Sequence, residues 1–182
     1  MPKESSAGGA TINLLQITDC HLTKEVSGEL LGVNTRESLD AVLDLIQDNI
    51  TRNIHEKPDY ILATGDLAQD ASVEAYQYFN DKMAAFDCPV SWFPGNHDSG
   101  SVMAQVVSKE AELNKVIQTG DWQFVLLDSS VAGSVHGFLD KEDLAVLEQT
   151  LSDNPDRHTM VCLHHHPIDI ESAWLDKIGL HN

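Results

Sequence analysis

The chain has 182 residues, of which 42% are hydrophobic and 22% charged, and these fractions are ordinary for a globular protein of one domain. Its net charge of −18 is not ordinary. A field of that sign repels nucleic-acid backbones and anionic membranes, so we expect neither as a partner and favour a small-molecule substrate.

The N-terminal segment and the cysteines indicate where the protein is located. Residues 1–10 are polar and rich in small residues, so we expect a flexible tail and no signal peptide. No stretch approaches the ~20 apolar residues of a membrane helix. Cys20, Cys88 and Cys162 cannot form a complete disulfide set, and free thiols indicate a reducing compartment. We therefore expect a cytoplasmic protein in which residues 11–182 form one domain.

Apolar runs and amphipathic patterns alternate along the first half of the chain. In chain order they predict a buried strand at 12–17, a loop with Gly28 and Gly32, a helix capped by Thr35, a strand at 60–64, a helix capped by Ser72, and a strand at 90–93. Residues 101–113 have only a weak helical pattern.

The second half predicts different elements. In chain order they are a hairpin of residues 115–118 and 122–127, a helix from about Asp140 to Leu151 with Leu144, Leu147 and Leu151 as its apolar stripe, and a buried strand at 159–163. The whole pattern predicts an α/β fold in which two mixed sheets pack as a sandwich with helices outside.

Groups of polar residues follow four of the predicted strands. They are Asp19-Cys20-His21, Gly65-Asp66, Gly95-Asn96-His97-Asp98 and His164-His165-His166-Pro167. Each group alone is an ordinary loop sequence, but strands that end side by side would bring all of them to one rim. Carboxylate and imidazole suit Mn²⁺, Fe and Zn²⁺, and a carboxylate between two ions allows paired-ion phosphoryl chemistry. The ordered series therefore predicts a binuclear metallophosphoesterase site.

With these groups the chain resembles the calcineurin-like metallophosphoesterases, whose signature runs D-x-H, G-D, G-N-H-[D/E], a His at a strand end, and G-H-x-H. Within that family it is most similar to the bacterial class III cyclic nucleotide phosphodiesterases, on the strings at 31–35, 64–68, 127–133 and 163–167. The resemblance implies a four-layer αββα fold and two divalent metal ions, Fe or Mn²⁺ before Zn²⁺. It also implies hydrolysis of 3′,5′-cyclic AMP to 5′-AMP by a hydroxide that the two ions activate.

The resemblance also implies which residues hold the metal ions. Asp19 and His21, two residues apart on an extended segment, would reach one ion, and Asp66 would bridge both ions. Asn96 would offer a neutral oxygen to the second ion. For the ligand at the end of the last strand we favour His164, whereas an alignment anchored on His-x-Pro would choose His165.

His97 is the expected catalytic acid, because it follows a metal ligand and would lie over the phosphate. Asp98 could orient its ring. His21, Asn96 and His97 are also expected to contact the substrate.

The G-H-x-H string of the signature is not found, and the sequence stops at Asn182. We therefore expect the C-terminal part of the fold to be missing, with three protein ligands for each ion, loose metal binding, slow turnover, and dimerisation through an uncovered sheet edge. Three alternatives stay open: a phosphomonoesterase, a glycerophosphodiesterase, and a weakly active fragment or scaffold module without turnover.

Overall fold

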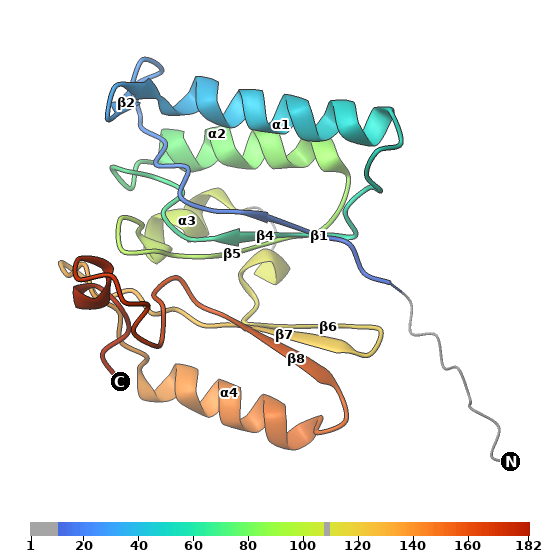
Figure 1. Cartoon of the computed structure of the whole chain (residues 1–182), viewed down its shortest axis with the longest axis vertical. Coiled ribbons are helices and arrows are strands. Elements are labelled where there is room, and N and C mark those ends of the chain that lie inside the picture. Colours follow the sequence, from blue (N-terminus) through green and yellow to red (C-terminus); the bar gives the residue numbers. More distant parts are fainter. Residues whose placement is uncertain (1–10, 108–109) are drawn as a thin grey trace, which may run out of the picture.

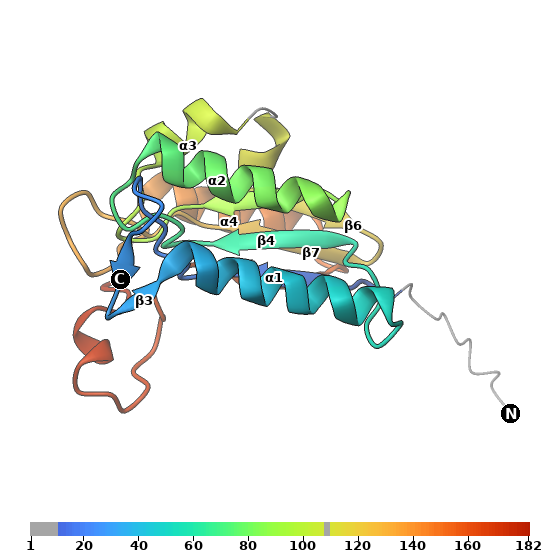
Figure 2. The same cartoon turned by 90° about the horizontal axis from the view of Figure 1, so that it is seen from above.

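The structure is a computed structural model that describes residues 11–107 and 110–182, so the tail expected at residues 1–10 lies outside the described residues. Figure 1 shows four layers: the helices α1 and α2, a first sheet, a second sheet, and the helix α4. Seen from above in Figure 2, α1 and α2 lie side by side over the first sheet. The predicted α/β fold and its αββα layers are confirmed.

The first sheet contains β1 (Leu14–Ile17), β4 (Tyr60–Thr64) and β5 (Val90–Phe93), in the order β1-β4-β5. Both pairs are parallel. This sheet was expected to be mixed, but among the described residues it is purely parallel. As a result, all three strands have their carboxyl ends at the same rim.

The second sheet contains β6 (Val116–Thr119), β7 (Trp122–Leu126) and β8 (His158–Cys162). The pair β6–β7 is the predicted antiparallel hairpin, and β7–β8 is parallel. The connection from β7 to β8 contains α4 (Lys141–Asp153). This sheet is mixed, as predicted.

The remaining helices are α1 (Thr35–Thr51), α2 (Val73–Met83) and α3 (Gly100–Val106), with short 3₁₀ helices at Ala84–Phe86, Glu110–Leu113 and Leu175–Lys177. Ser72 caps α2 as predicted, but Asn34 caps α1 in place of Thr35, because its side-chain oxygen accepts from the Glu37 amide at 3.0 Å. No helix in the described ranges is long and apolar enough to cross a membrane.

A short hairpin, β2 (Glu29–Leu30) and β3 (Val33–Asn34), lies where a loop was predicted. Its turn has Leu31 and Gly32 in the left-handed region, with φ of 52° and 82°. Two-residue strands carry too little periodicity to be recognised from sequence.

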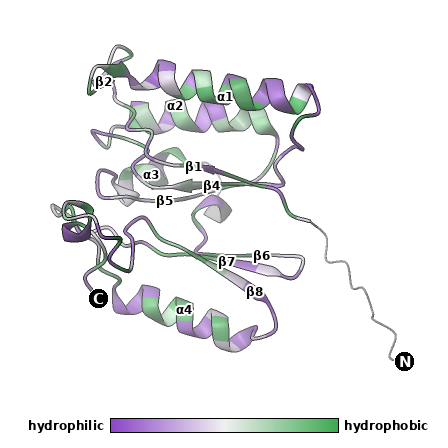
Figure 3. Cartoon of the chain, viewed as in Figure 1, coloured by the Kyte–Doolittle hydropathy of each residue, from purple (hydrophilic) through white to green (hydrophobic). Residues whose placement is uncertain are grey.

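Apolar side chains fill each of the three spaces between the layers. Figure 3 shows apolar and polar residues alternating along α1 and α4, as expected of helices with one buried face. The space between the two sheets is filled by Leu62, Phe93, Phe124 and Leu126. These contacts fix β7 against the first sheet, and β8, which is hydrogen-bonded to β7, is positioned with it.

Two predictions about burial are wrong. On α4, Leu144 and Leu151 are 43% and 44% exposed, because the helix instead turns Asp143 and Thr150 inward, where Asp143 binds the Lys115 ammonium at 2.7 Å. Strand β8 was expected to be buried, but Met160 and Val161 are both 40% exposed. The strand is at an edge of its sheet, so among the described residues it has a strand neighbour, β7, on one side only.

Candidate metal centre

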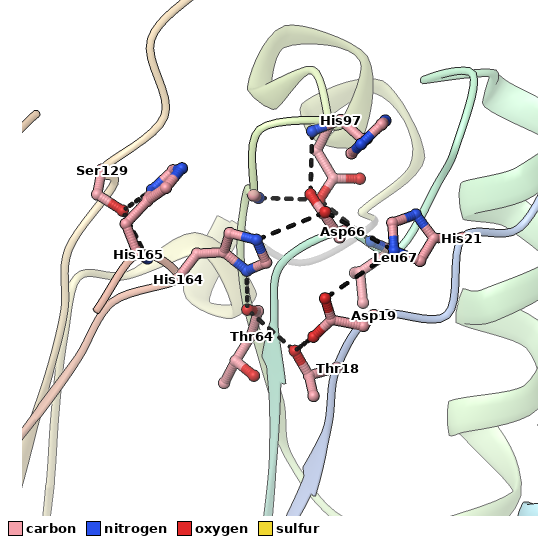
Figure 4. Close-up of polar contacts among 12 residues, drawn as sticks. Thr18, Asp19, His21, Thr64, Asp66, Leu67, His97, Ser129, His164 and His165 are labelled. Carbon is pink, nitrogen blue, oxygen red and sulfur yellow. Dashed lines mark hydrogen bonds and ion pairs between the residues drawn. The ribbon is translucent and has the colours of Figure 1, made fainter. Parts of the chain in front are cut away.

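The polar residues that follow β1, β4, β5 and β8 come together at one rim (Figure 4). His164 approaches from the second sheet, and its Nε2 lies 3.5 Å from Asp66 Oδ2, which comes from the first sheet. Six predicted site residues line one cavity of ~710 Å³ at this rim: Asp19, His21, Asp66, Asn96, His97 and His164. The convergence predicted from the sequence is therefore present in the structure.

Gly65 is required by the close approach of three chain segments. Its φ is +95°, a conformation that side chains disfavour. A Cβ at this position would also lie 2.6 Å from His164 Nδ1 and 2.8 Å from the Gly95 amide nitrogen. The glycine thus lets β4 turn sharply into Asp66 while His164 packs against the turn.

The segment with Asp19 and His21 is not extended, contrary to the prediction. Strand β1 ends at Ile17, and Asp19 and His21 have φ of 54° and 45°. Backbone hydrogen bonds fix this turn, since the Asp19 amide donates to Gly65 at 3.0 Å and the His21 amide donates to Asp66 at 2.9 Å. The two side chains still meet, because His21 Nε2 lies 3.9 Å from Asp19 Oδ1 and 3.8 Å from Asp66 Oδ2.

Two groups of donor atoms could each hold a metal ion. One contains His21, Asp66 and His97, the other Asp19, Asp66 and His164, and within each group the atoms lie within 4.8 Å of one another. Asp66 belongs to both groups, as a bridging carboxylate would. The division differs from the expected one, which placed Asp19 with His21. Carboxylate with imidazole is a donor set that suits divalent transition metals, so the residues present fit such ions.

The contact between Asp66 and His164 favours the ion pair, in which Asp66 is a carboxylate and His164 is protonated. Burial by itself would raise the pKa of Asp66, but the contacts with His164 and with the His97 amide hold it below its usual value. Burial lowers the pKa of His164, and the Asp66 carboxylate more than offsets this and raises it to about 9. The pocket beside Asp66 therefore favours a positive charge, here a proton on His164.

His165 has a different environment from His164. It is buried, and its Nδ1 lies 2.8 Å from the Ser129 hydroxyl. Burial, together with the neighbouring His164, lowers the pKa of His165 to about 4. Of the two histidines, the structure places His164 beside Asp66 and ties His165 to the segment after β7, in keeping with the preference for His164.

His97 is oriented by a residue that the sequence analysis missed. Its backbone amide donates to Asp66 Oδ1 at 2.9 Å, and its Nδ1 lies 3.2 Å from Gln69 Nε2. If the Gln69 amide donates, Nδ1 is the acceptor and the ring proton lies on Nε2. The only signal for Gln69 in the sequence is its place three residues after Asp66.

We expected Asp98 to orient the ring of His97, but in the structure its carboxylate binds other groups. Its carboxylate accepts hydrogen bonds from the amides of Leu67, Ala68 and Gly95 and from the Tyr76 hydroxyl, at 2.9–3.2 Å. Burial raises the pKa of Asp98. Asp98 therefore joins the loop after β4 to the loop after β5, and so acts on the framework of the site.

Comparison with known proteins places this site in a family. The chain matches the calcineurin-like phosphoesterases over residues 12–180, and it belongs to that family. Membership implies divalent metal ions, and the two donor groups provide places for them.

Among curated proteins, the chain is 47% identical over 173 residues to a 3′,5′-cyclic adenosine monophosphate phosphodiesterase of Haemophilus influenzae, a match that covers 94% of this chain and 61% of the relative. The protein of the same name in Escherichia coli K12 is 44% identical, with 97% and 63% covered. A 3′,5′-cyclic-nucleotide phosphodiesterase of Nostoc is 34% identical, with 94% and 63% covered. The chain thus spans about three fifths of the length of these relatives.

Proposed function

We propose that this chain carries a metal-dependent phosphodiesterase site that hydrolyses 3′,5′-cyclic AMP to 5′-AMP. The observation that carries the proposal is the position of Asp66, whose carboxylate belongs to both donor groups in the cavity that Asn96 and His97 also line. The names of the relatives support cyclic AMP as the substrate.

In this proposal Asp19, His21, Asp66, Asn96 and His164 hold two divalent ions. Mn²⁺ and Fe suit this mixture of carboxylate, amide and imidazole donors, with Zn²⁺ as an alternative. When bound, such ions activate water and neutralise the charge of the phosphate. The net charge of −18 disfavours nucleic acid as a competing phosphodiester. The three free cysteines support a cytoplasmic location.

His97 is the proposed acid. To act as an acid, its ring must carry a proton on both nitrogens. The buried Gln69 side-chain oxygen has no other partner, and with the amide turned so that this oxygen faces Nδ1–H it accepts from the ring and stabilises that form. Nε2–H then gives its proton to the departing alkoxide oxygen and leaves a neutral imidazole. The ring of His97 meets the ring of His21 edge-on, with centroids 5.1 Å apart. His21, Asn96 and His97 all line the cavity, so each can contact a phosphate bound there.

The test is a hydrolysis assay on the 182-residue chain loaded with Mn²⁺, with Asp66→Ala as the inactive control. We expect turnover of 3′,5′-cyclic AMP and of a nitrophenyl diester, and little of a nitrophenyl monoester. Preference for the monoester would indicate a phosphomonoesterase, and preference for glycerophosphocholine a glycerophosphodiesterase. Bound metal without hydrolysis of any ester would indicate a scaffold module, and each of these results would contradict the proposal.

A further inference from the structure

The cavity at the rim has a second wall that the proposed chemistry does not use. It is apolar and is lined by Val135, Trp174, Leu175 and Ile178. Val135 comes from the segment after β7, and the other three come from the segment after β8. In Figures 1 and 2 this last segment, drawn in red, lies on the side of the molecule where β4 and β5 end. One cavity therefore joins a charged half to an apolar half.

Trp174 is the most informative side chain of this wall, because it is 71% exposed. The other two tryptophans have aromatic partners: Trp92 meets Phe79 edge-on, and Trp122 stacks on Phe124. Within residues 11–107 and 110–182, no aromatic ring packs against Trp174. A large apolar ring left open at the mouth of a polar cavity indicates a binding surface.

The segment that carries Trp174 is fixed to the residues that follow β8. Asp176 Oδ1 accepts from the Ile170 amide at 2.9 Å and lies 3.6 Å from His166 Nε2. The Leu180 amide donates to the His166 carbonyl at 2.9 Å. Because His166 is two residues from His164, the apolar wall is held at a set position relative to the donor groups.

We propose that Trp174 stacks on the nucleobase of the substrate, while the phosphate lies at the charged half of the same cavity. This inference rests on the proposed function, since it assumes that the substrate is a nucleotide. Every nucleobase has a flat π-face, so stacking on an aromatic side chain does not depend on which polar groups the base carries. The ~710 Å³ cavity is of the size that holds a small-molecule ligand.

The test compares a ligand that has a base with one that lacks it. The 182-residue chain loaded with Mn²⁺ is titrated by calorimetry with 5′-AMP and with ribose 5-phosphate. We expect the wild type to bind 5′-AMP more tightly. Trp174→Ala should weaken binding of 5′-AMP by roughly 5- to 150-fold, the contribution of one base–aromatic stack, and leave ribose 5-phosphate unchanged. Trp174→Phe should keep most of the preference for 5′-AMP.

Fluorescence provides a second measurement that does not depend on a loss of affinity. Addition of 5′-AMP should quench the emission of Trp174, and this change should be absent in Trp174→Phe and present in Trp122→Phe, whose altered ring lies at the far end of β7. Val33→Ser serves as a control for position, because Val33 lines a second cavity that shares Asp19 and His21 with the first but does not include Trp174.

Three results would overturn the inference: equal affinity of the wild type for the two ligands, equal losses for both in Trp174→Ala, or loss of base preference in Val33→Ser alone. Failure of the proposed function would look different. In that case the wild type would not hydrolyse 3′,5′-cyclic AMP, whatever its preference for 5′-AMP.

Discussion

Asp66 is the residue on which both donor groups depend, because its carboxylate lies within 4.8 Å of the other members of each. We therefore expect Asp66→Ala to abolish binding of both metal ions. Asn96→Ala should weaken one of the two, since it removes a single neutral oxygen. Elemental analysis of each purified variant measures this. Two full equivalents of metal in Asp66→Ala would show that the carboxylate is not shared.

His97 is expected to act on the leaving group, so its effect should depend on how good that group is. His97→Ala should lower turnover of cyclic AMP by about 10²-fold or more with metal content nearly intact. The loss should be smaller for nitrophenyl diesters, whose leaving group needs no proton. Gln69→Ala, which removes the 3.2 Å contact to Nδ1, should cause a smaller loss with the same dependence. Equal losses for good and poor leaving groups would mean that His97 stabilises phosphate charge instead.

The ion pair of His164 and Asp66 makes the stability of the metal-free protein depend on pH. The pKa of His164 is raised from 6.5 to about 9 in the folded state. A raised pKa contributes stability that is fully present below pH 6.5 and is lost as the pH rises through about 9. Urea unfolding in the presence of a chelator, at pH 6 and pH 9.5, should show wild type losing more stability than His164→Gln. If the free energy of unfolding fell equally in wild type and in His164→Gln, the ion pair between His164 and Asp66 would be contradicted.

At the scale of elements, the site depends on two loops that Asp98 joins. Removal of its carboxylate leaves the amides of Leu67, Ala68 and Gly95 without partners. Asp98→Ala should therefore lower the free energy of unfolding by about 3 kcal/mol or more, measured by urea denaturation. Tyr76→Phe removes only one of the four bonds to Asp98, although its hydroxyl also accepts from the Ser99 amide, and should cost less. A larger loss in Tyr76→Phe than in Asp98→Ala would be evidence against this role.

Elements with strong local patterns were predictable from sequence, and those set by distant contacts were not. The apolar runs of β4 and β5 and the Ser72 cap of α2 act within a few residues, so the chain positions of these elements could be predicted, and the cap of α1 was missed by one residue. The inward face of α4 could not, because Asp143 is drawn in by Lys115, 28 residues away. The exposure of β8 likewise depends on its place at an edge of the sheet, which a five-residue pattern does not encode.

The same distinction applies to the site. The residue types around the rim followed from the strand-end motifs, because parallel strands deliver their following residues to one edge. The backbone between them did not, since the turn at Asp19 and His21 is left-handed and is held by hydrogen bonds to Gly65 and Asp66, which lie far along the chain. Gln69 was missed because a glutamine in a loop carries no chemical signal until His97 lies beside it.

At the scale of the whole molecule, β8 leaves a sheet edge open. Its Met160 and Val161 are partly exposed, and among the described residues β7 is its only strand partner. An open edge with apolar side chains favours pairing with another chain. We therefore expect the 182-residue chain to self-associate, and Val161→Lys to shift it toward monomer in analytical ultracentrifugation. A wild type that stays monomeric at high concentration would contradict this prediction.

In the proposed site, two metal ions share the Asp66 carboxylate where the strands of both sheets end. Anomalous diffraction at the manganese absorption edge, from crystals of the chain grown with Mn²⁺, measures the ion positions directly. We expect two peaks, each next to Asp66, one on the side of His21 and the other on the side of His164. A single peak, or two peaks of which one lies away from Asp66, would contradict it.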